Sequence, residues 1–340
     1  MSIAKTTHWQ KLPNGDVQCL VCPRCCKMKN NGDRGFCYGR GRYNDEVVLF
    51  TYGKTTGLAA DPIEKKPLYH FLPTTTTLSF GTLGCNLACK FCQNWQITRQ
   101  TEDEIPQRNA SPEHIVSLAQ NYRVPSIAFT YNDPVVFLEY AKDTAQLANQ
   151  NNIKTVAVTA GYINPKARED FFSFINAANV DLKGFNDSFY KKLSKGHLEP
   201  VLETLEYIAN ETNTWLEITN LLIPGQNDSE EDLDKMTAWI AEKLGPQVPI
   251  HFSAFYPQYQ MSDLPPTSVA TLKTAKNIAK KNGLKYVYLG NVTDDESSST
   301  ECKECGNLLI KRSRFIAQKI GVSKEGKCIK CGTMCDGVFL

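Results

Sequence analysis

The stretch LSFGTLGCNLACKFCQNW, residues 78–95, joins a strand-like run to three closely spaced cysteines. Its first part, 78–83, is predicted to form a buried strand. Its second part places Cys85, Cys89 and Cys92 in a Cx3Cx2C pattern on the loop that follows. Thiolates bind soft iron centres well, and three of them can hold three corners of a cubane iron–sulfur cluster. The fourth iron would then lack a protein ligand, and an open metal position is what a catalytic centre needs.

The alternative for this triad is a zinc knuckle or a group of buried structural cysteines. A structural zinc takes four ligands, and no nearby His or Cys supplies a fourth. The pattern therefore favours an iron–sulfur cluster, which Phe91, directly before the last cysteine, would shield.

Strand-like and helix-like segments alternate after this loop. Strands are predicted at 126–130, 154–159, 179–184, 215–223, 250–255 and 285–290, with helical patterns between them at 135–149, from Pro165, at 187–195, 199–211, 230–244 and 267–282. Such alternation implies parallel βαβ units in an α/β fold. Six or seven units suit a full or partial (β/α) TIM-like barrel, and an open doubly wound sheet is the alternative. In a barrel the active site lies at the carboxyl ends of the strands.

Composition excludes several classes of protein. The 340 residues include 38 Lys+Arg and 36 Asp+Glu, so net charge gives no indication of nucleic-acid binding. The aromatic content of 10% argues against a disordered chain. No apolar run reaches the roughly 18–20 residues that span a bilayer, and the first ten residues lack the apolar region of a signal peptide. We expect a cytoplasmic protein without a membrane partner.

The 13 cysteines form three groups, and their odd number in a chain without an export signal argues against a disulfide scaffold. In the last group the pairs Cys302/Cys305 and Cys328/Cys331 are each spaced CxxC, as in a zinc ribbon. Tetrahedral zinc is the first choice there and rubredoxin-type iron the second, with Cys335 spare. We therefore predict four parts: a Cys-rich N-terminal metal-binding module (1–45), the barrel (46–292), a linker (293–301) and the zinc-ribbon-like module (302–340).

The central motif resembles that of the radical S-adenosylmethionine (SAM) superfamily, Cx3Cx(aromatic)C. The resemblance extends over essentially the whole chain to the AmmeMemoRadiSam-system radical SAM enzymes, relatives of the glycyl-radical (pyruvate formate-lyase) activating enzymes. It is carried by the segments DPIEKKPLYHFLP (61–73), CQNWQIT (92–98), TYNDP (130–134), VDLKGF (180–185), IPGQND (223–228), PIHFSAFYPQYQM (249–261) and YVYLGN (286–291).

The resemblance implies a 4Fe-4S cluster on Cys85, Cys89 and Cys92 whose open iron binds SAM. Reductive cleavage of SAM gives a 5′-deoxyadenosyl radical, which abstracts hydrogen from a substrate that the sequence does not identify. It also implies an electron donor such as flavodoxin or ferredoxin, Memo-like and AMMECR-like partner proteins, and sensitivity to oxygen.

The resemblance also implies a set of SAM-binding residues. An acidic or Gly-rich motif after the second strand contacts the SAM amino group, and here Asp replaces the commoner Glu; Ala160 departs from the Asn-Gly pair usual after the third strand. For each position an ordinary turn, salt bridge or buried strand end is the structural alternative. No catalytic residue is assigned, because His70 and His251 are better explained as core residues. The predicted set is Asn132, Asp133, Pro134, Gly161, Asp181, Lys183, Thr219 and Ile223.

In the N-terminal group, Cys19, Cys22, Cys26 and Cys37 match a family pattern and Cys25 is extra. Structural zinc and an auxiliary iron–sulfur cluster both fit. The basic stretch Arg34, Arg40 and Arg42 beside it is expected on a solvated surface.

Two other functions stay open from the sequence. One is the activation of a glycyl-radical enzyme. The other is a zinc-binding scaffold or nucleic-acid-binding protein without catalysis, although such a protein has no use for a three-thiolate loop with an open fourth position.

Overall fold

The computed structural model describes residues 3–101, 104–293 and 295–339 and has an eight-stranded sheet at its centre. The strand β8 (Gly57–Pro62) lies at one edge and runs antiparallel to its neighbour. The other strands are parallel and follow in chain order across the sheet: β9 (Thr76–Gly81), β11 (Ser126–Phe129), β12 (Lys154–Thr159), β13 (Ala177–Asp181), β14 (Trp215–Leu222), β15 (Ile250–Ala254) and β16 (Val287–Gly290).

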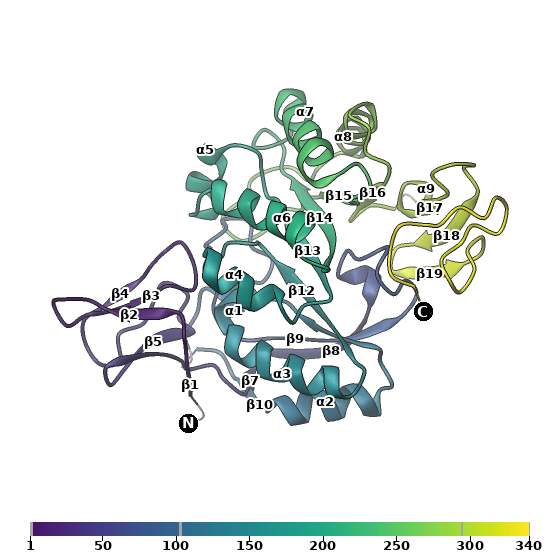
Figure 1. Ribbon diagram of the computed structural model, residues 1–340. Helices are drawn as coiled ribbons and strands as arrows, with labels where there is room; N and C mark the ends of the chain where they lie inside the picture. The colour runs from purple at the N-terminus through teal and green to yellow at the C-terminus, as the bar shows by residue number, and fades with distance from the viewer. Residues whose placement is uncertain (1–2, 102–103, 294, 340) are drawn as a thin grey trace.

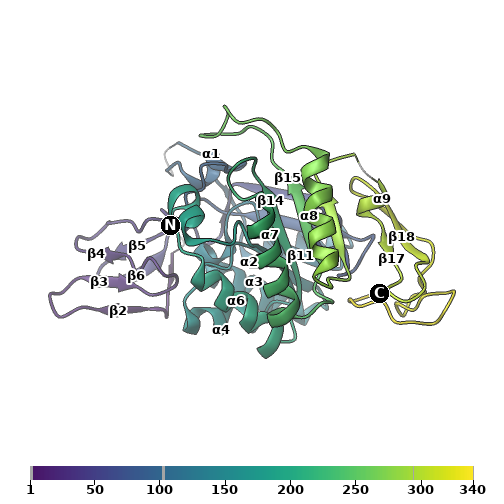
Figure 2. The same ribbon diagram turned by 90° about the horizontal axis from the view of Figure 1, so that it is seen from above.

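This order decides between the two predicted architectures. Each parallel strand pairs with the next one along the chain, so every crossover advances in the same direction and places its helix on the same face. A doubly wound sheet would reverse its strand order at one point. The helices lie along one side of the sheet (Figures 1 and 2): α2 (Pro112–Asn121), α3 (Leu138–Gln150), α4 (Pro165–Phe172), α6 (Glu199–Glu211), α7 (Glu230–Trp239) and α8 (Val269–Lys281). The predicted partial (β/α) barrel is confirmed.

The helices begin where local chemistry favours it. Ser229 caps α7 by accepting a hydrogen bond from the backbone N–H of Asp232, and Ser268 caps α8 in the same way. Leu272, Ala275 and Ala279 of α8 are buried, whereas Val269 at its start is 43% exposed. Two predicted helices change form along their length: α5 (Asp187–Phe189) and α7 continue as π-turns at Tyr190–Ser194 and Ile240–Leu244. Within the described residues, no helix is long and apolar enough to cross a membrane.

The N-terminal module packs against the carboxyl end of the barrel (Figure 1). Its strands form two small sheets, β2-β3-β4 and, together with β6 from just beyond residue 45, β1-β6-β5. A Cβ atom on Gly84, just after β9, would stand 1.9 Å from the carbonyl oxygen of Cys37, so the two backbones touch. The strands are β1 (Ala4–Lys5), β2 (Trp9–Lys11), β3 (Val17–Cys19), β4 (Lys27–Met28), β5 (Arg40–Tyr43) and β6 (Glu46–Leu49).

Arg40 corrects one expectation from the sequence. Rather than lying on a solvated surface, its side chain is 2% exposed and pairs with Glu139 of α3 through two hydrogen bonds of 2.9 and 2.6 Å. The charge therefore ties the module to the barrel, because a buried guanidinium requires such a partner.

The C-terminal module lies at the opposite, amino end of the barrel, against residues 63–75 (Figure 1). It contains a three-stranded antiparallel sheet of β17 (Thr300–Glu301), β18 (Leu308–Ser313) and β19 (Ile316–Lys319). The fully buried Arg312 donates hydrogen bonds of 2.6 Å to the carbonyl of Tyr69 and to Thr300 Oγ1, and its Nε lies 3.8 Å from Glu64. The predicted linker 293–301 holds α9 (Asp295–Ser298) and β17, while residue 294 lies outside the described residues.

The two histidines considered for catalysis lie inside this amino end. His251 Nε2 is 2.7 Å from a carboxylate oxygen of Glu217, which also accepts hydrogen bonds from the N–H groups of Tyr69 and His70 and from Trp215 Nε1. Burial lowers the pKa of His70 to about 4, so its ring is neutral at pH 7. Both histidines are thus satisfied core residues at the end of the barrel that stabilises the fold.

The buried Arg312 yields a prediction about stability. Arg312→Ala leaves Glu64 buried without its positive partner, so we expect a loss of about 3–5 kcal/mol in the free energy of unfolding. The matched control is Lys311→Ala on the exposed side of β18, with an expected change within about 0.5 kcal/mol. Denaturant unfolding followed by tryptophan fluorescence measures both, and equal midpoints for the two variants would contradict the role given to Arg312.

Candidate active site

The three central cysteines lie on the loop that follows β9, at the carboxyl edge of the sheet. Their side chains are partly buried. The backbone N–H of Leu87 points at Cys85 Sγ from 3.4 Å, and Cys92 Sγ lies 3.4 Å from Thr98 Oγ1 in the short helix α1 (Trp95–Thr98). The thiols thus already have polar neighbours of the kind that tune iron–sulfur ligands.

Asn132 holds the start of this loop. Its side-chain oxygen accepts a hydrogen bond from the N–H of Thr82 (2.9 Å), and its amide nitrogen donates to Thr82 Oγ1 (3.1 Å) and to the carbonyl of Gly84 (2.7 Å). All these groups are buried. Asn132 therefore fixes the backbone directly before Cys85, and its predicted contact with SAM stays a prediction.

Two further asparagines anchor the loop, and neither was predicted from the sequence. Asn86 donates to the carbonyl of Tyr162 (2.7 Å), and Asn94 donates to the carbonyl of Tyr131 (2.8 Å). Their positions within the cysteine motif are the only sequence signal for this role. Together they join the loop to the ends of β12 and β11.

The rest of the loop is tied to neighbouring segments. The N–H groups of Ala88 and Lys90 donate to the carbonyls of Ser194 (3.0 Å) and Leu193 (2.8 Å). Trp95 stacks on Tyr259 with ring centroids 5.2 Å apart and an angle of 9° between the planes. The loop is therefore held on several sides by contacts that involve no metal.

Asp133 joins two strand ends. One carboxylate oxygen accepts hydrogen bonds from the Thr159 hydroxyl (2.9 Å) and the N–H of Val135 (3.1 Å), and the other accepts from the N–H of Ala160 (2.9 Å). Burial raises the pKa of this carboxyl. Pro134 is buried as the first residue of a 3₁₀ turn, Pro134–Phe137. Both residues thus lie where the sequence places SAM, but the carboxylate already has three donors.

Gly161 and the Asp181–Lys183 pair lie at the ends of the next two strands. Gly161 has φ +65°, and a Cβ there would stand 3.2 Å from the side chain of Val180. Lys183 Nζ donates to Asp181 at 2.8 Å. Burial disfavours the charge of Lys183, but Asp181 and Cys89 together hold its pKa above the usual value. This ion pair therefore lies within electrostatic range of the cysteine loop.

Thr219 and Ile223 complete the predicted set on β14 and just beyond it. Thr219 lies opposite Asp181 in the parallel register and donates to Asn179 Oδ1 at 2.9 Å. Ile223 is fully buried, and its N–H donates to Asn227 Oδ1 at 2.7 Å. The structure thus brings seven of the eight predicted residues to the carboxyl edge of the sheet, around the cysteine loop. Thr219 instead lies within β14, opposite His251 of β15 in the parallel register.

The C-terminal cysteines form a different kind of site. Their four sulfur atoms lie within 4.8 Å of one another, with Cys302–Cys331 at 3.6 Å and Cys305–Cys328 at 3.7 Å. Tetrahedral thiolates around one ion lie about 3.8 Å apart, since Zn–S bonds are about 2.3 Å long. The arrangement therefore fits a single metal ion. Cys335 lies apart from the four, 3.9 Å from His70 Nδ1.

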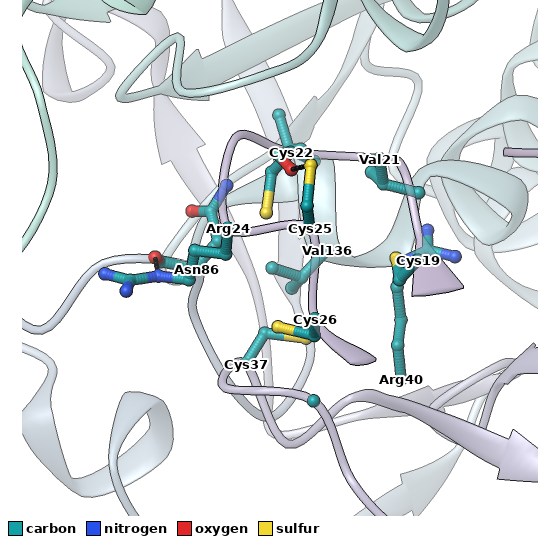
Figure 3. A pocket seen from close by; sticks show the side chains of 12 residues that line it. Cys19, Val21, Cys22, Arg24, Cys25, Cys26, Cys37, Arg40, Asn86 and Val136 are labelled. Atoms are coloured by element: carbon teal, nitrogen blue, oxygen red, sulfur yellow. Dashed lines mark hydrogen bonds between the residues drawn. The ribbon is translucent and has the colours of Figure 1, made fainter. Parts of the chain in front are cut away.

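The N-terminal cysteines surround a cavity in front of the barrel (Figure 3). All five cysteines line it, and Arg40 lies on the side of Cys19. Asn86, the residue after Cys85, also lines this cavity. The cavity of the N-terminal cysteines therefore borders the loop of the central cysteines.

Whether an iron–sulfur cluster fits the central triad can be judged from its donors. Among the described residues, the set of three or more His, Cys, Asp or Glu ligand atoms within 4.8 Å of one another is the C-terminal one alone. At least one pair of the central sulfurs is therefore more than 4.8 Å apart, which suits a four-iron cluster that binds each thiolate to a separate iron. Three thiols on a rigid loop at the carboxyl edge fit that group.

Comparison with known proteins agrees with this geometry. The family model of the radical SAM superfamily matches residues 80–237. An uncharacterised protein of Methanocaldococcus jannaschii is 44% identical over 332 residues, which cover 97% of this chain and 98% of that protein. A putative glycyl-radical enzyme activating enzyme of the same organism is 23% identical over 165 residues, 47% of this chain and 61% of that protein.

A solved structure shows the same fold. The crystal structure of a radical SAM methyltransferase from Sphaerobacter thermophilus superposes with a TM-score of 0.53 at 17% identity, covering 70% of this chain and 71% of that one. The cysteine loop, the parallel sheet and these similarities agree: the chain is an enzyme and belongs to the radical SAM superfamily.

Proposed function

We propose that this enzyme cleaves SAM reductively and uses the resulting 5′-deoxyadenosyl radical to abstract hydrogen from a substrate. The observation that carries the proposal is the position of Cys85, Cys89 and Cys92 on one rigid loop at the carboxyl edge of the sheet. These cysteines would hold a 4Fe-4S cluster, which would supply the electron and an open position for SAM.

The residues of this chain hold and enclose the reacting groups. Asn132 fixes the backbone before Cys85, and the Asp181–Lys183 pair supplies charge within range of Cys89. Phe91 is 5% exposed and packs against Phe189, so it covers the inner side of the loop. Enclosure matters, because a primary carbon radical attacks any C–H bond it meets.

We further propose that the enzyme belongs to the AmmeMemoRadiSam system and acts with Memo-like and AMMECR-like proteins. The support is the set of segments that resemble that family, from 61–73 to 286–291. A ferredoxin or flavodoxin would supply electrons, and the reducing cytoplasm would protect an oxygen-sensitive cluster. Activation of a glycyl-radical enzyme is the second candidate, favoured by the similarity of 165 residues to a putative activating enzyme.

For the C-terminal module we propose a structural zinc bound by Cys302, Cys305, Cys328 and Cys331. The support is the spacing of their sulfurs, which suits one tetrahedral ion. Gly306 and Gly332, with φ of +67° and +77°, follow the second cysteine of each pair and allow the tight turns. Because the module has only a small apolar core of its own, the ion would contribute much of its folding energy.

The first prediction concerns the reaction. After anaerobic reconstitution with iron and sulfide, the protein should convert SAM to 5′-deoxyadenosine with dithionite, as measured by mass spectrometry. Cys85→Ala should abolish this product, whereas Cys335→Ala, outside all three predicted ligand sets, should keep it. Formation of 5′-deoxyadenosine by Cys85→Ala would contradict the proposal. So would a reconstituted protein that fails to bind the cluster or fails to bind SAM.

The second prediction concerns the positioning role of Asn132. Asn132→Leu leaves the N–H of Thr82 and the carbonyl of Gly84 buried without partners, and each such loss costs about 1–3 kcal/mol. We expect a lower unfolding temperature and faster loss of central iron to a chelator. Asn94→Ala, which removes one bond at an exposed residue, is the control and should lose iron more slowly than Asn132→Leu. Equal rates of iron loss in the two variants would contradict the positioning role of Asn132.

The third prediction concerns the C-terminal metal. Elemental analysis should find about one zinc per chain held by four thiolates. Cys328→Ser should lose this zinc and expose the C-terminal module to protease, whereas Cys335→Ser should retain it. Iron in place of zinc at this site, or full zinc content in Cys328→Ser, would refute the assignment.

A further inference from the structure

We propose that the N-terminal cavity binds a second, polynuclear iron–sulfur cluster through Cys19, Cys22, Cys26 and Cys37, directly beside the Cys85 loop. The binding of this cluster is independent of SAM cleavage, and only its role as an electron relay rests on the function proposed above.

Four of the five N-terminal cysteines are chosen as ligands because the fifth, Cys25, uses its thiol in a hydrogen bond. The thiol of Cys25 donates to the carbonyl of Cys22 (3.7 Å; Figure 3), a bond that a metal-bound thiolate cannot make because it has no proton. Cys26, by contrast, accepts a hydrogen bond from the N–H of Phe36 (3.4 Å), the kind of amide donor that supports cluster ligands. The four other cysteines are thus left to hold a cluster.

The spacing of the sulfurs argues against one zinc ion. The chain contains an internal standard, because the C-terminal sulfurs lie within 4.8 Å of one another. Within the described parts of the chain, no three of the N-terminal sulfurs meet that limit, although all five cysteines line the same cavity. Ligands of a polynuclear cluster stand on separate irons and are therefore spread more widely than ligands of one ion.

A buried donor points independently to an anionic occupant. Arg40 pairs with Glu139 through its two terminal nitrogens, and its Nε is buried with no acceptor among the described residues. Arg40 lines the cavity, whose other walls include the apolar Val21, Val135 and Val136. A thiolate or sulfide would accept the free N–H, and the positive charge would balance a negatively charged cluster in this dry site.

The cavity adjoins the catalytic loop. Asn86 lines it and directly follows Cys85, and the carbonyl of Cys37 touches the backbone of Gly84. Arg24 lies between the two groups: it donates to the carbonyl of Asn86 and interacts electrostatically with the thiols of Cys22, Cys26 and Cys85. A cluster here could accept one electron from a low-potential donor of the ferredoxin or flavodoxin class, beside the site that consumes one electron for each SAM cleaved.

The decisive measurement separates the two iron sites by mutation. In full-length protein with Cys85, Cys89 and Cys92 all changed to Ala, anaerobic reconstitution should still give about four irons per chain and an EPR signal after reduction. Zinc should stay at about one per chain. A second zinc in place of iron, or neither metal in a folded protein, would overturn the proposal.

A reciprocal variant guards against misfolding of the first. Cys22→Ala/Cys26→Ala should lower the iron content of the reconstituted protein from about eight to about four per chain, whereas Cys25→Ala should leave it at about eight. Iron that stays at about four in all three proteins would show that only the central site is filled. Loss of this iron with SAM cleavage by dithionite intact would still support the site, because a chemical reductant bypasses a relay.

The charge of Arg40 gives a readout beyond metal content. In the triple-alanine background, Arg40→Gln/Glu139→Gln removes the buried charge and its partner together. Arg40 lines the cavity and Glu139 does not, so the lost positive charge is the nearer of the two. The reduction potential of the remaining cluster should therefore fall, because a positive neighbour stabilises the more negative reduced state. An unchanged potential would show that Arg40 does not act on the cluster, and would contradict its role in balancing the cluster charge.

Discussion

The structure depends on one constraint. The sulfurs of three cysteines on a short loop must keep fixed positions relative to one another, although no fourth protein ligand helps to hold them. A loop of this length cannot do so alone, because its backbone has many accessible conformations. The chain solves the problem with side-chain amides. Asn132, Asn86 and Asn94 bind the loop to the ends of neighbouring strands, and Trp95 stacks on Tyr259 from across the barrel mouth.

The two terminal modules lie at opposite ends of the barrel. The N-terminal module borders the cysteine loop, and the C-terminal module stabilises the opposite end. The N-terminal module reaches the carboxyl edge through Cys37 and the buried Arg40–Glu139 pair. The C-terminal module covers the amino end through Arg312 and the histidine-rich core around Glu217. Each junction buries an arginine, and a buried charge needs a partner on the barrel. Each module and its docking surface therefore form one unit.

Much of the fold follows from the sequence because its signals are local. Strand and helix periodicity predicted every parallel strand, and Pro165 marked the start of α4. The misses are long-range. Nothing local distinguishes Arg40, which is buried, from the exposed arginines expected nearby, because its partner Glu139 is 99 residues away. The anchoring bonds of Asn132 are likewise long-range, because its partners Thr82 and Gly84 lie about 50 residues earlier in the chain.

Cysteine spacing along the chain shows the same limit more sharply. The N-terminal and C-terminal groups both contain CxxC pairs, and from the sequence zinc suits either. In three dimensions their sulfurs differ: one set closes to the distances of a single ion, and the other opens around a cavity with a buried, unsatisfied arginine Nε among the described residues. The separation of the donors and the charge beside them, rather than the number of cysteines, therefore decide which metal a site of this kind can hold.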